Sequence, residues 1–315
     1  MSDLIKVHSE KLRDETKLRR FVDLPKFLQL LVKERLFFPS LDQLAKGDPF
    51  EASISNRVKY EQMDLAALRN RALQLLDQIP HDVMARNAHE RRKRALKLLD
   101  SMDNDLLIDS IIDLEIRQFR SGIVCSCWHE GDGESDAMWK IYAAHPGVCI
   151  ESTVGRLKES FENIYILDNG VVSARPSALE IARVEYVGDQ WPGFIEPFYF
   201  DRPWLLKRKA FEHEKEVRIS HTVSNMVTGR KGLNFQVHLD RLLETVVLSP
   251  FNPTWVNDVI ISTIGAVRPT ISCGLSISRH MTEPDRDNPL VSILRAEELA
   301  AQLRKGGWSL NPPEN

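Results

Sequence analysis

Residues 211–219 read FEHEKEVRI and place three glutamates at the start of an alternating apolar pattern. Side chains alternate between the two faces of a strand, so a strand here directs Glu214 and Glu216 to one face and Val217 and Ile219 to the other. Two carboxylates held side by side repel each other, and a site can use them to stabilise positive charge or to bind a hydroxyl. The alternative is a solvated strand end.

Composition excludes several classes of protein. The chain has 315 residues, of which 43% are hydrophobic and 28% charged, as in ordinary globular proteins of one or two domains. The net charge of −3 argues against nucleic-acid binding that depends on an overall positive charge. We find no apolar stretch that could cross a bilayer and no signal-peptide core at the N-terminus. We therefore expect a cytoplasmic protein without a membrane partner.

The cysteines and histidines do not have the spacing of a metal site. Two cysteines, Cys125 and Cys127, are separated by one residue, and no CxxC or Cys/His zinc spacing occurs. The P-loop and dinucleotide glycine fingerprints are also absent. The sequence therefore predicts no metal and no Rossmann-type cofactor site.

Apolar periodicity divides the chain into an interrupted core, an insertion and a tail. Residues 1–58 and 121–283 alternate short strands and helices, whereas residues 59–120 are helical throughout. Residues 284–315 form a tail with a short helix. The sequence predicts an α+β fold in which a mixed or antiparallel sheet carries a helical insertion.

Within these regions the pattern predicts particular elements. We expect two helical runs in the insertion, over residues 65–76 and 91–116. Residues 182–187 alternate as one strand, and residues 204–211 are expected to form a helix before the glutamate-rich stretch. The tail helix is expected over residues 291–303.

Several landmarks resemble the bacterial domain-of-unknown-function family 2971, over roughly residues 17–280. In chain order they are Gly47–Glu51 (GDPFE), Cys125–Trp128 (CSCW), Met138–Ala143 (MWKIYA), Gly147–Cys149 (GVC), a lysine at 207 or 209, and Glu214–Arg218 (EKEVR). The chain departs from the family at Leu18–Phe21, which replaces a Tyr-x-Tyr-Arg pattern, and at Gly47 and Val217. The family name implies no activity.

The order of elements also resembles the ADP-ribosyltransferase superfamily. That order is a strand with a basic residue, a helix, an aromatic strand, a serine-bearing strand and a Glu-x-Glu motif entering a strand. Glu214–Glu216 matches the Glu-x-Glu motif, and Arg19 or Arg20 the first-strand arginine. Ser126 matches the central serine, a position for which Ser40 competes.

The second resemblance implies NAD as the substrate, because cleavage of its nicotinamide–ribose bond is the chemistry of that group. Positive charge develops on the ribose, and a carboxylate on the ribose hydroxyl, here Glu216, stabilises it. Glu214 would orient the acceptor, and Arg19 or Arg20 would bind the diphosphate through paired donors. Ser126 would hold the ribose or the carboxylate by a hydrogen bond.

Further candidates surround this set. Trp139 and Tyr142 stand three residues apart and, on a helix, would form an aromatic wall for nicotinamide, although the same spacing is typical of core residues. Four other candidate site residues are Asp48, Glu51, Lys207 and Arg218. Asp48 and Glu51 can instead brace a turn, because Asp-Pro starts turns.

We therefore expect an NAD-consuming, ADP-ribosyltransferase-like enzyme, either a transferase or a glycohydrolase, with bacterial conflict or phage defence as its setting. This hypothesis predicts that Glu216, Ser126 and one of Arg19 or Arg20 line one cleft, and it fails if Glu216 faces solvent away from the others. One alternative is a non-catalytic interaction or regulatory module. Another is a metal-dependent nuclease, with the carboxylates Asp48, Glu51, Glu214 and Glu216. The acceptor, the oligomeric state and the role of the insertion do not follow from the sequence.

Overall fold

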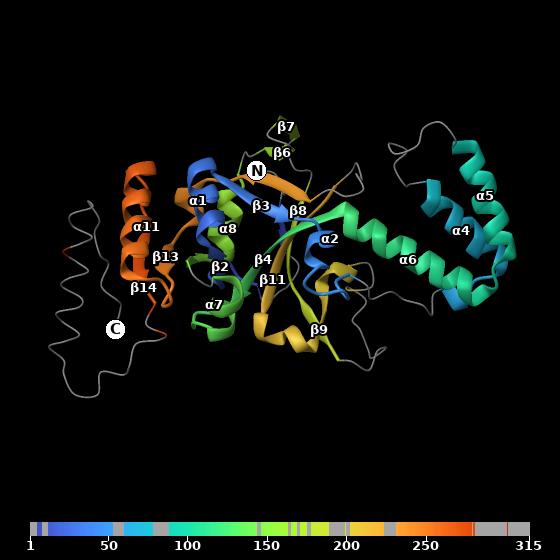
Figure 1. The fold of residues 1–315 in the computed structure, drawn as a ribbon, viewed down its shortest axis with the longest axis horizontal. Coiled ribbons are helices and arrows are strands. Elements are labelled where there is room, and N and C mark those ends of the chain that lie inside the picture. The colour runs from blue at the N-terminus through green and yellow to red at the C-terminus, as the bar shows by residue number, and fades with distance from the viewer. Residues whose placement is uncertain are drawn as a thin grey trace.

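The computed structural model of the chain is an α+β fold built on an eight-stranded mixed sheet, which confirms the predicted fold class (Figure 1). The structure describes residues 5–7, 12–52, 60–77, 88–143, 146–162, 165–168, 171–174, 178–188, 199, 202–223, 231–278, 280 and 301. Among these residues, no helix is long and apolar enough to cross a membrane.

The main sheet has the strand order β1-β8-β11-β4-β2-β5-β13-β14. Its strands are β1 (Ile5–Val7), β2 (Lys17–Asp23), β4 (Ile123–Glu130), β5 (Gly147–Thr153), β8 (Leu179–Arg183), β11 (Glu216–Thr222), β13 (Thr245–Leu248) and β14 (Gly274–Ile277). The central strands pair antiparallel, and the outermost pair at each edge is parallel.

Two smaller sheets accompany the main one. The first has the order β3-β12-β6-β7, with β3 (Arg35–Pro39), β12 (Gly232–Gln236), β6 (Ile166–Asp168) and β7 (Val171–Ala174). The second is a parallel pair of β9 (Glu185–Val187) and β10 (Leu206–Arg208). Short helices connect the strands: α1 (Leu24–Lys33), α2 (Leu41–Leu44), α7 (Asp136–Tyr142), α8 (Val154–Ser160), α10 (Leu239–Leu242), α11 (Thr254–Val267), and the 3-10 helices η3 (Pro203–Leu205) and η4 (Lys209–Glu214).

Strand β11 confirms the predicted strand but corrects the predicted position of Glu214. Val217 and Ile219 are fully buried in the main core, so the alternating pattern does form a strand. The strand begins at Glu216, however, and Glu214 ends the 3-10 helix η4. Lys215 between them has a left-handed backbone with φ of 40°, which turns the chain and breaks the period-two relation of the two carboxylates.

The main sheet opens between β2 and β4. Strand β2 pairs with β5 along all of Lys17–Asp23, but it pairs with β4 only through Leu18 with Glu130 and Arg19 with His129. Beyond Arg19 the two strands diverge, while β4 stays paired with β11 along its length. Side chains of both strands therefore face a gap in the sheet.

The insertion is a helical segment with a core of its own. It comprises α4 (Leu65–Asp77), α5 (Ala88–Ser101) and α6 (Asn104–Gly122), and α4 and α5 lie apart from the sheet at the end opposite α11 (Figure 1). The predicted single run over 91–116 is wrong, because Asp103 caps a new helix by accepting from the Leu106 backbone N–H. Helix α6 runs directly into β4 with no intervening loop.

Two further element predictions need correction. Residues 182–187 belong to two strands in different sheets, because the Val184 N–H donates to the Glu216 carbonyl and the chain then leaves the main sheet. Residues 204–211 are not one helix, since the backbone of β10 pairs with β9 between two short 3-10 turns. The predicted tail helix lies outside the described residues except for Ala301.

The separate helical core generates a stability prediction. Replacing the fully buried Leu107 with alanine should lower the free energy of unfolding by about 2–5 kcal/mol, because it leaves a cavity between α4 and α6. Leu106 is 52% exposed, and its replacement with alanine is the matched control, expected to cost less than about 1 kcal/mol. Urea denaturation followed by circular dichroism measures both, and equal losses would contradict the assigned packing.

Candidate functional site

A cavity of about 490 Å³ lies at the gap between β2 and β4, a volume typical of small-molecule sites. We call it the split pocket. Its wall combines residues of β2, β4, β11, α7, η4 and the turn after α2. The charged side chains that line it are Arg19, Arg20, Lys26, Asp48, Glu51, Lys207, Glu214, Glu216 and Arg218.

The strand register aligns four polar residues across the sheet. Glu216 on β11 is opposite His129 on β4, His129 is opposite Arg19 on β2, and Arg19 is opposite Glu151 on β5. Residues that face each other across neighbouring strands project to the same side of a sheet. One face therefore carries a polar row, and three of its members line the split pocket.

Arg218 is the buried centre of the charge network. Its guanidinium is fully buried and donates from Nε to Glu216 at 2.7 Å and from Nη2 to Glu51 and Glu216, each at 3.0 Å. Burial by itself would raise the pKa of Glu216, but the Arg218 and Lys207 cations outweigh it and lower the pKa to about 2. Glu216 is therefore a carboxylate held ionised and in one orientation.

Lys207 joins the two carboxylates of the Glu-x-Glu motif. Its Nζ donates to Glu214 and, at 3.2 Å, to Glu216, while the Tyr142 hydroxyl donates to Glu214 at 2.6 Å. Burial favours the neutral amine, yet the two carboxylates raise the pKa of Lys207 above its ordinary value. The amine therefore stays protonated and is a poor Schiff-base nucleophile. Lys209, the other candidate lysine, is exposed.

Arg20 is the cation of this site that no carboxylate neutralises among the described residues. Its guanidinium donates to the Ser126 hydroxyl and, at 3.4 Å, to the Phe37 carbonyl, and it lies 5.7 Å from the Trp128 ring centroid. Burial lowers the pKa of Arg20, although a guanidinium stays charged in proteins. A charged group at a pocket without a protein counterion favours an anionic ligand.

Two other lining residues have a buried polar atom without a hydrogen-bond partner in the part of the chain that the structure describes. These atoms are Nη1 of Arg19 and Oδ2 of Asp48. The other terminal atom of each group is paired: Arg19 Nη2 donates to Glu151, and Asp48 Oδ1 accepts from Arg208 at 2.8 Å. An unsatisfied buried polar atom costs about 1–3 kcal/mol, and a ligand would satisfy these two only if the side chains that cover them move.

The structure excludes Ser126 and Trp139 from the predicted cleft. Ser126 is fully buried and is opposite Ile219, on the face of the sheet away from Glu216. On that face its hydroxyl accepts a hydrogen bond from Arg20. Trp139 is also buried, donates to Glu134 at 2.8 Å and packs edge-on against Phe21 at 4.9 Å between ring centroids. Both are supporting residues, whereas the other predicted site residues line the pocket.

Sequence reasoning missed His129, because its isolated position matched no motif. Its Nδ1 lies 2.7 Å from the Glu214 carbonyl oxygen, so Nδ1 carries the hydrogen and Nε2 has the free lone pair. Burial lowers the pKa of His129, and the ring is neutral at neutral pH. Cys127 lies two residues before His129, so a strand places both side chains on one face. Only the strand register places His129 opposite Glu216.

The three buried glutamates are poor candidates for metal ligands. Glu51 and Glu216 are paired with Arg218, and Glu214 with Lys207. The described residues contain no group of three or more His, Cys, Asp or Glu side chains arranged to hold a metal ion. The pairing favours a role in binding or electrostatic stabilisation for these carboxylates.

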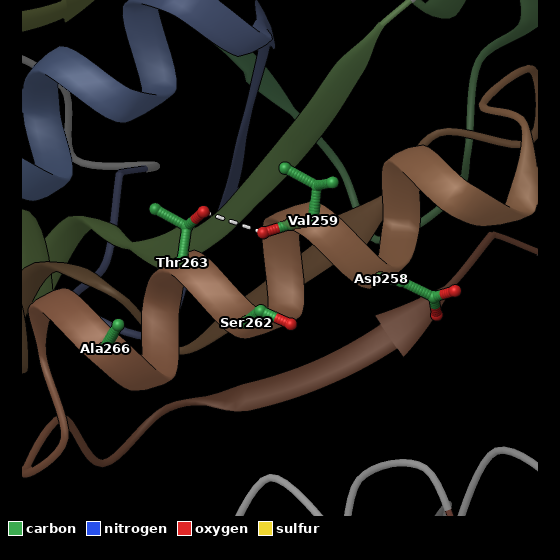
Figure 2. Close-up of a pocket in the computed structure, with 5 residues that line it drawn as sticks. All are labelled: Asp258, Val259, Ser262, Thr263 and Ala266. Atoms are coloured by element: carbon green, nitrogen blue, oxygen red, sulfur yellow. Dashed lines mark hydrogen bonds between the residues drawn. The ribbon is translucent and has the colours of Figure 1, made fainter.

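A second hollow, of about 460 Å³, lies along the outer face of α11. Figure 2 shows its five lining residues on this one helix, with the Thr263 hydroxyl donating to the Val259 carbonyl. Its side chains form no charge network comparable to that of the split pocket.

No protein-family model, curated protein or solved structure matches the chain. The resemblances to family 2971 and to the ADP-ribosyltransferase superfamily stay predictions. The residues of the split pocket therefore carry the functional argument.

The low pKa of Glu216 generates a prediction about acid stability. A carboxyl whose pKa is about 2 in the folded state and 4.5 ordinarily stabilises the fold above about pH 4.5, and this stabilisation is lost as the pH falls toward 2. At neutral pH, Glu216→Gln should cost on the order of 3 kcal/mol, because Arg218 and Lys207 each lose one of their two charged partners. Unfolding titrations of both proteins should show the difference shrinking from about pH 5 to about pH 2. A difference independent of pH would contradict the ionised pair, and Glu162→Gln, in an exposed ion pair, is the control.

Proposed function

We propose that the split pocket binds NAD and that the protein cleaves the nicotinamide–ribose bond, as an ADP-ribosyltransferase-like enzyme. The observation that carries this proposal is the meeting, in one pocket, of an ionised carboxylate from β11 and an uncompensated arginine from β2. Glu216 supplies the first and Arg20 the second. Almost two hundred residues of chain separate them, so the fold and not a local motif joins them.

The arginine side of the pocket suits the diphosphate of a dinucleotide. Arg20 is fixed by the Ser126 hydroxyl and the Trp128 ring, which orients its planar donors. Arg19 lines the same pocket and is paired with Glu151. Guanidinium groups bind phosphate oxygens through paired donors, and Arg20 can do so without breaking an ion pair with a carboxylate.

The carboxylate side of the pocket suits a ribose that gains positive charge. Glu216 Oε1 accepts from Arg218 Nε at 2.7 Å, and a carboxylate oxygen has two lone pairs, so the group can also accept from a ribose hydroxyl. Arg218 and Lys207 hold the carboxylate in place before the substrate binds. Preorganised charge of this kind stabilises an oxocarbenium-like state without a reorganisation cost.

Tyr142 provides the aromatic surface for nicotinamide. It lines the pocket from α7, it is 41% exposed, and its hydroxyl is tied to Glu214. Phe211 lines the same pocket. Aromatic faces of this kind bind planar rings by stacking.

A conservative change at Glu216 tests the catalytic role. Glu216→Asp keeps the charge near Arg218 but withdraws it by one methylene, so nicotinamide release should fall by about 10²–10³-fold while NAD affinity changes by less than about tenfold. The assay incubates the protein with NAD labelled in the nicotinamide ring and follows the free base. Glu162→Asp is the control, and a wild-type rate in Glu216→Asp would remove Glu216 from the mechanism.

A change at Arg20 tests the binding role. Arg20→Lys keeps the charge but loses the planar donor pair, and the dissociation constant for NAD should rise by about 10–100-fold. Isothermal titration calorimetry measures it, with the exposed Arg241→Lys as control. If NAD and ADP leave the melting temperature of the wild-type protein unchanged, the pocket is not a nucleotide site. NAD binding without release of nicotinamide would instead support a non-catalytic sensor.

A further inference from the structure

We propose that His129 is the general base of the split pocket and that the nucleophile it activates is water, so that the enzyme is an NAD glycohydrolase. This inference rests on the proposed function above and adds the acceptor to it. Four observations carry it: the position of the ring, its tautomer, its charged surroundings and the occupation of the competing carboxylate.

The position of His129 follows from the strand register. It is the direct partner of Glu216 across the β4–β11 ladder, and both side chains line the split pocket. Opposite residues on neighbouring antiparallel strands have Cβ atoms about 4.5–5.5 Å apart. A base at this distance from the ribose-binding carboxylate can reach a water beside the reacting carbon.

The tautomer leaves the correct nitrogen free. Nδ1 donates to the Glu214 carbonyl at 2.7 Å, and the ring is held edge-on to Phe21 with 6.1 Å between centroids. Within the described part of the chain, Nε2 forms no hydrogen bond and is not among the buried unpaired atoms. Nε2 therefore has accessible surface and a free lone pair, on a residue that lines the split pocket.

Charged groups on each neighbouring element set the protonation of this ring. Arg19 on β2 and Lys215 before β11 oppose a positive imidazole, whereas Glu130 on β4 and the Glu214 carbonyl favour it. Glu216 faces it from β11. Burial is the largest influence and lowers the pKa of His129 below its ordinary value of 6.5, so the base form is present at neutral pH.

Glu214, the acceptor-orienting group expected from the sequence, is already occupied. Tyr142 donates to its Oε1 and Lys207 to its Oε2, and the carboxylate lies on η4, not on the strand. These two hydrogen bonds fix the carboxylate in one orientation, whereas Nε2 of His129 has no hydrogen-bond partner in the described part of the chain. His129 is therefore the better candidate for the base.

The proposed step is balanced. The C–N bond between ribose and nicotinamide breaks, and its electron pair stays on the nicotinamide nitrogen and cancels the positive charge of the ring. The water oxygen bonds to the ribose carbon, and one water proton passes to Nε2 of His129 and then to solvent. NAD and water thus give nicotinamide, ADP-ribose and one proton.

The test uses two matched variants of the full chain. His129→Asn keeps an N–H donor toward the Glu214 carbonyl but removes the base, and its rate of nicotinamide release should fall by at least about a hundredfold with little change in NAD affinity. His221→Asn is the control. That ring is also buried, its Nδ1 lies 2.8 Å from the Ala178 carbonyl oxygen, and it lies outside the pocket, so its rate should stay within about twofold of wild type.

Two further readouts separate a base from a structural residue. The wild-type rate should fall as the pH drops below 6.5 and the ring is protonated, and His129→Asn should lack this fall. Azide attacks without losing a proton, so it should restore nicotinamide release to His129→Asn. A wild-type rate and pH profile in His129→Asn would overturn this inference and leave the proposed function standing. ADP-ribose transferred to protein, with none free, would overturn water as the acceptor, and the absence of any release by the wild type would overturn both proposals.

Discussion

The structure depends on one buried cation, the guanidinium of Arg218. It binds Glu51 from the turn after α2, the Trp204 carbonyl from η3 and Glu216 from its own strand, so three distant segments meet on one side chain. A charge without solvent is costly unless it is paired, and removing one partner leaves the others buried and unpaired. The segments around Arg218 must therefore assemble together, and Glu216 is fixed as a result.

The pocket exists because the sheet does not close. Strands β2 and β4 share only two residue pairs. In a continuous sheet their polar side chains would pack against a neighbouring strand, but here they face open space. Arg20 reaches across this gap to Ser126 on the far face of β4. The gap thus brings groups from both faces of one sheet to one cavity, with Arg20 on one side and Glu216 on the other.

The sequence predicts individual strands better than it predicts how they pair and where the chain turns between them. The alternation of Val217 and Ile219 is sufficient to identify a strand, and it correctly places Glu216 on the opposite face. Glu214 was misplaced because the left-handed turn at Lys215 leaves no mark in the apolar pattern. His129 was missed for a different reason: it faces Glu216 only through pairing between segments 87 residues apart, and no local pattern encodes a register.

The direct junction of α6 and β4 has a mechanical consequence. A helix of 19 residues is a stiff rod roughly 28 Å long, and its last residue, Gly122, is followed at once by the first residue of β4. No flexible joint absorbs a displacement at its far end. The helical segment is therefore joined directly to the strand that carries Trp128 and His129, and a displacement of α6 would move one border of the gap in the sheet.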